Sequence, residues 1–108
     1  MTRSLDSHGV DTGLQVELIN RLQKIFSDTP TIKKVILYGS RAKGTYRAGS
    51  DIDLAFVGEI SHQELMVVDT RIDDLLTPYM YDLSVVSDIT NSALLEHIQR
   101  VGLVIYSS

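Results

Sequence analysis

Residues 38–57 read YGSRAKGTYRAGSDIDLAFV, and the rest of the chain is arranged around this stretch. An apolar run ends abruptly at Gly39-Ser40, a loop rich in basic residues and glycine follows, and Asp51-Ile52-Asp53 opens a second apolar run. Residues two apart on a strand point to the same face, so these two carboxylates would repel each other. A divalent cation relieves that repulsion, and Mg²⁺ prefers oxygen ligands. The stretch predicts a metal held by Asp51 and Asp53, with a phosphate bound near Gly39-Ser40.

The composition excludes several classes of protein. With 108 residues, we expect a loosely held, flexible N-terminus over residues 1–11 and one domain over residues 12–108. The chain has no cysteine, which excludes disulfides and thiolate metal sites. A net charge of −4 argues against direct nucleic-acid binding. No apolar run reaches the length of a membrane span, and the N-terminus lacks the apolar core of a signal peptide. We therefore expect a cytoplasmic protein that does not bind membranes.

Helices and strands alternate along the chain. Thr12 with Gln15 predicts the start of a first helix, Ser61 with Glu64 a capping box for a second long helix, and Asn91 a cap for a third. Strands are expected at residues 32–38, 51–57, 81–86 and 103–106, a short helix at 40–43, and the long helices at 12–28, 61–77 and 91–102. The pattern predicts an α/β or α+β fold.

The connections predict how the strands pair. Residues 58–80 contain a whole helix, as a parallel crossover requires, so strands 51–57 and 81–86 should be parallel neighbours. That arrangement places Asp82 beside Asp51 and Asp53. For the Gly39-Ser40 turn to meet these carboxylates, strand 32–38 must run antiparallel to strand 51–57. We therefore expect a mixed sheet of about four strands, with helices packed against it and the last strand near an edge.

These residues carry a resemblance to a known family. The stretch GSRAKGTYRAGSDIDLAFV, the strand YDLSVVS and the ending LLEHIQRVGLVIY are similar to the DNA polymerase β-like nucleotidyltransferase superfamily. They resemble most its minimal nucleotidyltransferase branch, which includes the antitoxins of HEPN/MNT toxin–antitoxin modules. The resemblance implies that Asp51, Asp53 and Asp82 hold two Mg²⁺ ions and that Gly39 and Ser40 bind the nucleoside triphosphate.

The chemistry of nucleotidyl transfer suits this set of residues. A hydroxyl attacks the α-phosphorus in line, two metals can hold the attacking and leaving oxygens, and a carboxylate near the hydroxyl can take its proton. Asp82 is our candidate for that base. Arg41 and Lys43 flank the phosphate turn, and alternation predicts that only one of them points inward; we expect Arg41.

Other residues near the stretch have two open interpretations. Ser50 either donates to Asp51 or caps its own turn. Tyr46 either stacks on a base or packs on the surface. Tyr79 and Tyr81 are expected to complete the core. His62 and His97 are expected to be surface or partly packed residues, because no histidine pair has metal-ligand spacing.

The resemblance also implies a partner and an activity. Larger members of the superfamily hold the acceptor with a helical domain, and in the resembling branch a separate HEPN protein supplies that half. We therefore expect an Mg²⁺-dependent nucleotidyltransferase that moves AMP from ATP to a tyrosine of a HEPN toxin. Two alternatives stay open: an antitoxin that neutralises its partner by contact alone, and nucleotidyl transfer to a small molecule.

Overall fold

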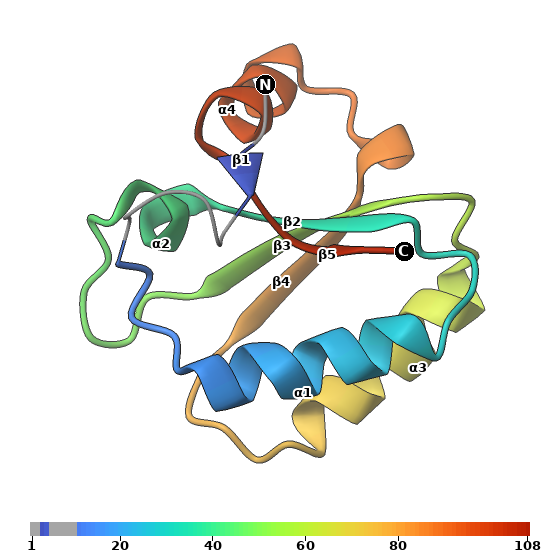
Figure 1. Ribbon diagram of the computed structural model, residues 1–108. Coiled ribbons are helices and arrows are strands. Elements are labelled where there is room, and N and C mark those ends of the chain that lie inside the picture. Colours follow the sequence, from blue (N-terminus) through green and yellow to red (C-terminus); the bar gives the residue numbers. More distant parts are fainter. Residues whose placement is uncertain (1–2, 5–10) are drawn as a thin grey trace.

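A computed structural model describes residues 3–4 and 11–108 of the chain (Figure 1). The elements in chain order are β1 (Arg3–Ser4), α1 (Val16–Ser27), β2 (Lys34–Tyr38), α2 (Gly39–Lys43), β3 (Ile52–Val57), α3 (His62–Asp73), β4 (Tyr81–Val85), the 3₁₀ helix η2 (Val86–Asp88), α4 (Ser92–Val101) and β5 (Leu103–Ser107). The expectation of a flexible segment at residues 1–11 falls mostly on 1–2 and 5–10, which lie outside the described residues.

The strands form one mixed sheet in the order β1-β5-β2-β3-β4. Strands β2 and β3 are antiparallel, and β3 and β4 are parallel, which confirms the pairing predicted from the crossover. Strand β5 pairs with β2 near one edge of the sheet, as expected. The two-residue strand β1, which pairs with β5 in parallel, was not predicted because so short a segment has no readable period.

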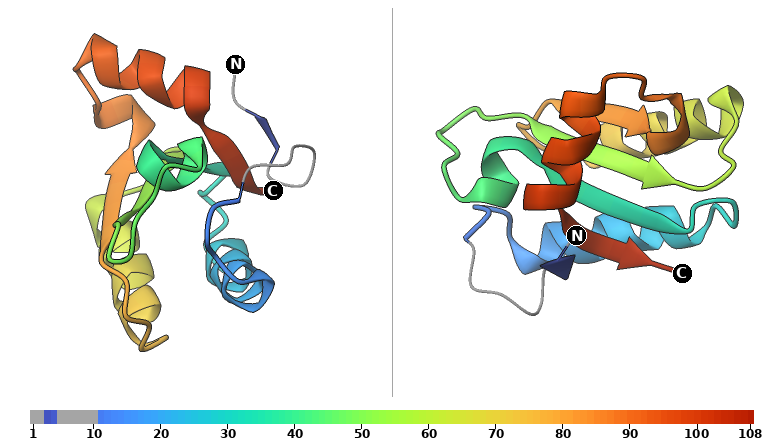
Figure 2. Two further views of the ribbon diagram at one scale, coloured as in Figure 1. Left: turned by 90° about the vertical axis from the view of Figure 1, so that its left-hand side faces the viewer. Right: turned by 90° about the horizontal axis from the view of Figure 1, so that it is seen from above.

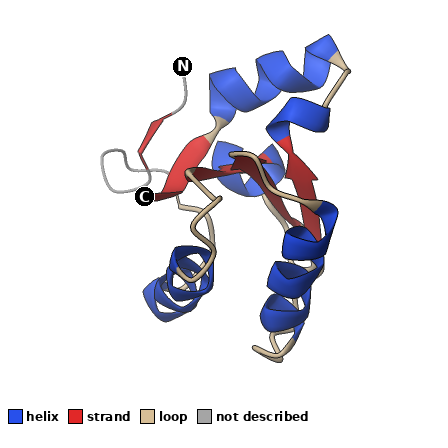
Figure 3. Cartoon of the chain, turned by 90° about the vertical axis from the view of Figure 1, so that its right-hand side faces the viewer, coloured by secondary structure: helices blue, strands red, loops and turns tan. Residues whose placement is uncertain are grey.

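The two faces of the sheet are covered unequally. Helices α1 and α3 pack on one face, and α4 with η2 lies over the other (Figures 1 and 3). The main core fills the α1 and α3 side, where the Phe26 and Phe56 rings meet edge to face at 5.5 Å. A small cluster of Ile36, Tyr38 and Ala55 packs under Ile98 of α4 on the other side.

Two helix boundaries differ from the sequence prediction. Helix α1 begins at Val16 rather than after Thr12, and its N-cap Gln15 makes no side-chain cap hydrogen bond. The Thr12 hydroxyl instead accepts from the Leu14 N–H at 3.3 Å, because residues 11–15 cross the molecule as an irregular segment. Helix α3 ends at Asp73, and Leu76 has a positive φ of 55°, which turns the chain before residues 77–78.

The other capping predictions are confirmed. Ser61 accepts from the Glu64 N–H at 3.1 Å, and the Glu64 carboxylate accepts from the Ser61 N–H at 2.9 Å, which makes a complete capping box. Asn91 accepts from the N–H groups of Ala93 and Leu94 at the start of α4. Within residues 3–4 and 11–108, no helix has the length and apolar character that crossing a bilayer requires.

Candidate active site

Strand pairing brings the predicted carboxylates together at one end of the sheet. Asp53 on β3 is the Cα partner of Asp82 on β4 and of Tyr38 on β2. Directly opposed residues in neighbouring strands project to the same face, and Asp51 precedes Asp53 by two positions. Because Tyr38 belongs to the cluster under α4, all three carboxylates lie at the end of the face that α4 covers.

Asp53 is the electrostatic centre of this group. It is half-buried, whereas Asp51 and Asp82 are exposed. Burial raises the pKa of Asp53, and the negative charges of Asp82 and Asp51 raise it further. The repulsion inferred from the Asp-x-Asp spacing is therefore present in the folded chain.

The donor set fits a divalent cation by its chemistry. Carboxylate oxygens are the ligands that Mg²⁺ prefers, and a cation would offset the repulsion at Asp53. Among the residues that the structure describes, no three acidic or histidine side chains are close enough to form a ready-made metal centre. Ligation would therefore need the side chains of Asp51 and Asp82 to turn toward Asp53.

The Gly39-Ser40 turn contacts the central carboxylate. Gly39 begins α2 directly after β2 and has a positive φ of 77°, a region that disfavours residues with a Cβ. A Cβ at Gly39 would overlap Oδ2 of Asp53, so the absent side chain is what lets the carboxylate lie against the turn. The first turn of a helix also presents backbone N–H groups without intrahelical partners, which favour an anion at this end.

Two neighbours of the turn were not recognised from the sequence. His97 on α4 accepts a hydrogen bond from the Gly39 N–H at its Nε2, with a donor–acceptor distance of 3.3 Å. Its ring meets the Tyr38 ring edge to face at 6.2 Å. Burial raises the pKa of Tyr38, the charges of Asp82 and Asp53 add to this, and a hydrogen bond with Ser84 opposes it. The helical spacing around His97 shows only that it is partly packed.

Arg41 lies in a different place from the one predicted. The residue is only 3% exposed, and its guanidinium donates to the carbonyl oxygens of Thr12 at 2.9 Å and of Ser50 at 3.2 and 3.3 Å. The Tyr46 and Tyr79 rings lie on the guanidinium, and the centroid of each ring is 4.8 Å from the guanidinium carbon. The expectation that Arg41 extends toward phosphates is therefore wrong for this conformation, because carbonyls and aromatic rings already bind its charge.

Lys43 is the exposed cation of the same helix. It lies near enough to His97 to lower the pKa of that imidazole, which places it on the α4 side of the turn. The Ser50 hydroxyl accepts from the Arg47 N–H at 2.8 Å, which supports the interpretation of Ser50 as a turn residue. Tyr46 packs on Arg41, and Tyr79 and Tyr81 pack against the main core, as expected for the last two.

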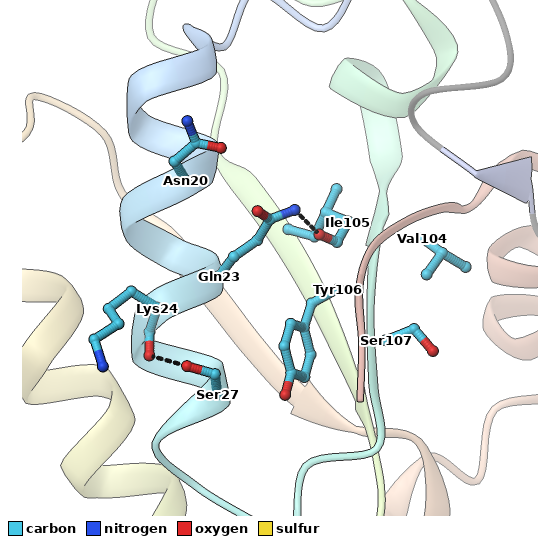
Figure 4. A pocket seen from close by; sticks show the side chains of 8 residues that line it. All are labelled: Asn20, Gln23, Lys24, Ser27, Val104, Ile105, Tyr106 and Ser107. Atoms are coloured by element: carbon cyan, nitrogen blue, oxygen red, sulfur yellow. Dashed lines mark hydrogen bonds between the residues drawn. The ribbon is translucent and has the colours of Figure 1, made fainter.

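The carboxylates lie at the end of the sheet where Asp51 and Asp82 are exposed. A hollow lined by eight residues lies elsewhere, between α1 and β5 (Figure 4). Gln23 of α1 donates to the Ile105 carbonyl at 2.7 Å across this hollow. None of its lining residues is a predicted site residue. The three carboxylates and the strand–glycine–helix turn therefore form the candidate site, apart from this hollow.

Comparison with known families identifies the class of protein. Residues 20–108 match the family described as "Polymerase beta, Nucleotidyltransferase". The chain belongs to this family, and the matched range includes Gly39, Ser40 and all three carboxylates. The resemblance to the polymerase β-like nucleotidyltransferase superfamily is therefore confirmed.

Individual relatives add detail. A Methanocaldococcus jannaschii protein named "putative protein adenylyltransferase" is 36% identical over 56 residues, which are 52% of this chain and 54% of that protein. The match therefore spans about half of either protein.

Two solved structures have a similar fold. A toxin–antitoxin complex with AMP-PNP contains a chain with a TM-score of 0.69 and 20% identity, covering 83% of this chain and 73% of that one. A tri-AMPylated Shewanella oneidensis HEPN toxin bound to its MNT antitoxin contains a chain with a TM-score of 0.66 and 17% identity, covering 88% and 74%. At these identities the likeness establishes the fold.

Proposed function

We propose that this protein is an Mg²⁺-dependent nucleotidyltransferase that moves AMP from ATP to a tyrosine hydroxyl of a HEPN partner protein. The observation that carries the proposal is the register Tyr38–Asp53–Asp82, which sets two carboxylates on neighbouring strands level with the last residue of β2, just before the Gly39 turn. Membership in the nucleotidyltransferase family supports the reaction class. The AMP group and the HEPN acceptor are supported by the adenylyltransferase relative and by the AMPylated complex of similar fold.

Each group has a role in the transfer. Asp51, Asp53 and Asp82 would hold the cations, which would neutralise negative charge that develops during the transfer. We assign the triphosphate to the Gly39-Ser40 turn, through backbone N–H groups other than that of Gly39, which donates to His97.

Proton transfer and phosphate binding fall to the more exposed groups. Asp82 is exposed on β4, which is an edge strand of the sheet, so an acceptor carried by another molecule can approach it. It takes the hydroxyl proton as the new bond to the α-phosphorus forms and pyrophosphate leaves. We assign the cation beside the phosphates to Lys43, since Arg41 is buried.

The test is transfer to a HEPN protein from the same genome. The partner is incubated with this protein, ATP and Mg²⁺, and its intact mass is measured. We expect the mass of one or more AMP groups, lost in Asp51→Asn and Asp53→Asn but kept in Asp69→Asn, which removes an exposed carboxylate of α3 on the opposite face.

The outcomes separate the alternatives. An unmodified partner that is nonetheless inhibited would contradict transfer and favour an antitoxin that acts by contact. AMP found on a small hydroxyl compound with the partner left unmodified would keep the reaction class but change the acceptor.

A further inference from the structure

Helix α4 reaches the phosphate turn through a single imidazole. His97 lies 58 residues beyond Gly39 in the chain, and its Nε2 accepts from the Gly39 N–H at 3.3 Å. Helix α4 crosses over β2 near the point where α2 begins (Figure 2). The edge-to-face contact with Tyr38, at an interplanar angle of 82°, fixes the ring beside the last residue of β2. His97 thus links α4 both to the last residue of β2 and to the first residue of α2.

We propose that His97 is a positioning residue whose neutral imidazole holds the Gly39-Ser40 turn in its nucleotide-binding form. The proposal rests on the proposed function for its nucleotide, but its hydrogen bond can be tested without one. A neutral imidazole has one nitrogen that accepts and one that donates. Since Nε2 accepts from Gly39, the proton belongs on Nδ1. An imidazolium has no acceptor, so protonation removes the bond.

The geometry of Gly39 makes this bond important for the site. Glycine adopts many backbone conformations, so the positive φ of 77° at Gly39 has to be selected by contacts around it. The carboxylate of Asp53 lies against the bare Cα of the same residue. His97 therefore holds the backbone that both presents the N–H groups of α2 and adjoins the central carboxylate.

The surroundings of His97 favour the neutral form. It faces the Tyr38 ring from β2, Lys43 from α2 and Arg100 from its own helix. Burial lowers the pKa of His97 below its ordinary value, and the positive charges of Arg100 and Lys43 lower it further. At neutral pH the imidazole can therefore accept from Gly39, and acidification is needed to remove the bond.

The first experiment reads the bond directly. In the ¹⁵N-labelled full chain at neutral pH, NMR of the imidazole should show His97 as the Nδ1–H tautomer. The Gly39 amide signal should shift with the same midpoint as the His97 ring on acidification. In His97→Gln, which keeps an oxygen acceptor but cannot titrate, the Gly39 signal should lose that step. An Nε2–H tautomer, or a Gly39 signal that ignores His97, would overturn the proposal.

The second experiment measures ATP binding with Mg²⁺ and no acceptor, by calorimetry across a pH series. One net hydrogen bond corresponds to about a 2- to 10-fold change in affinity, so His97→Ala should bind ATP more weakly by that factor at neutral pH. Because protonation of Asp53 weakens Mg²⁺ and ATP binding in every variant, wild type should lose that factor in addition on acidification, and His97→Gln should lose only the part due to the carboxylates. His62→Gln, at the exposed start of α3, serves as the control and should behave as wild type.

The outcomes distinguish this proposal from the one it rests on. Full-strength ATP binding by His97→Ala, or a loss of affinity on acidification that is as large in His97→Gln as in wild type, would overturn the positioning role while leaving the site intact. Tighter ATP binding on acidification through His97 would also overturn it, because the imidazolium would then act as a phosphate ligand. Absence of ATP binding in every variant would overturn the proposed function and the nucleotide role of His97 together, and the tautomer would still decide the hydrogen bond.

Discussion

Replacing Gly39 by alanine tests whether the turn and the central carboxylate form one unit. The change has two consequences that a second variant separates. Gly39 and Gly49 both have positive φ, 77° and 85°, so a Cβ strains the backbone at either position. The Cβ at Gly39 would overlap Oδ2 of Asp53, whereas the Cβ at Gly49 meets nothing within 4 Å. Gly49→Ala is therefore a matched control for backbone strain.

We expect a small loss of unfolding free energy in both variants and a large loss of AMP-transfer rate in Gly39→Ala only. A residue with a Cβ at positive φ costs about 1 kcal/mol of unfolding free energy, which lowers the melting temperature of a domain this size by about 4–8 °C. Both variants should show this loss. The Asp53 side chain can rotate away from the new methyl group, so Gly39→Ala should be little less stable than Gly49→Ala. A reacting group displaced by about 1 Å costs about 100-fold in rate, and only Gly39→Ala should lose AMP transfer by such a factor.

The assay pairs thermal unfolding with the initial rate of AMP transfer. Equal melting temperatures with a large difference in rate would support the contact between Gly39 and Asp53. If Gly39→Ala transfers AMP as fast as Gly49→Ala, the position of the Asp53 carboxylate against the turn is not needed. If both variants lose the same large factor, backbone strain alone is responsible, and the reasoning is refuted.

Three further predictions concern stability. Because the raised pKa of Asp53 makes the folded state bind protons more readily than the unfolded state, this residue's contribution to stability should fall as pH rises through its titration range; Asp53→Asn or added Mg²⁺ should raise the melting temperature at neutral pH, and a lower value would contradict this. Arg41→Met leaves the carbonyls of Thr12 and Ser50 without their donor and should cost about 2–5 kcal/mol in chemical denaturation, with a loss below about 1 kcal/mol as the contrary result. Asn91→Ala removes the cap of α4 and should cost about 1 kcal/mol in the same assay; an unchanged midpoint would show that the cap is dispensable.

The sheet and the carboxylate group could be predicted because their signals are local. Strand periodicity placed Asp53 and Asp82 near strand starts, and the length of the connection between them required a parallel crossover. Gly39 was recognisable as a turn because it directly follows an apolar run in the sequence. The structure adds why it must be glycine, since the overlap with Asp53 arises only once β2 and β3 pair.

The role of Arg41 could not be predicted because its partners are distant in the chain. The carbonyl of Thr12 and the ring of Tyr79 reach it from segments 29 residues before and 38 residues after it, and no periodicity links them. The same contact explains the late start of α1. The Thr12 carbonyl accepts from the guanidinium and the helix begins only at Val16, so the good N-cap composition at Thr12 was overridden by a tertiary contact.

His97 shows the same limit from the functional side. Helical spacing predicted that α4 packs on the sheet, and Ile98 does so. The neighbouring imidazole contacts the turn because of the angle at which α4 crosses β2, which the spacing of apolar residues does not determine.

The most direct test of the account follows one label. ATP carrying the label on its α-phosphate or on its γ-phosphate is incubated with the protein, Mg²⁺ and the HEPN partner. We expect the α-label to move to the partner with release of pyrophosphate, the γ-label not to move, and Asp53→Asn and Asp82→Asn to lose the transfer. A γ-label on the partner, or an α-label transferred equally well by Asp53→Asn, would contradict nucleotidyl transfer at this site.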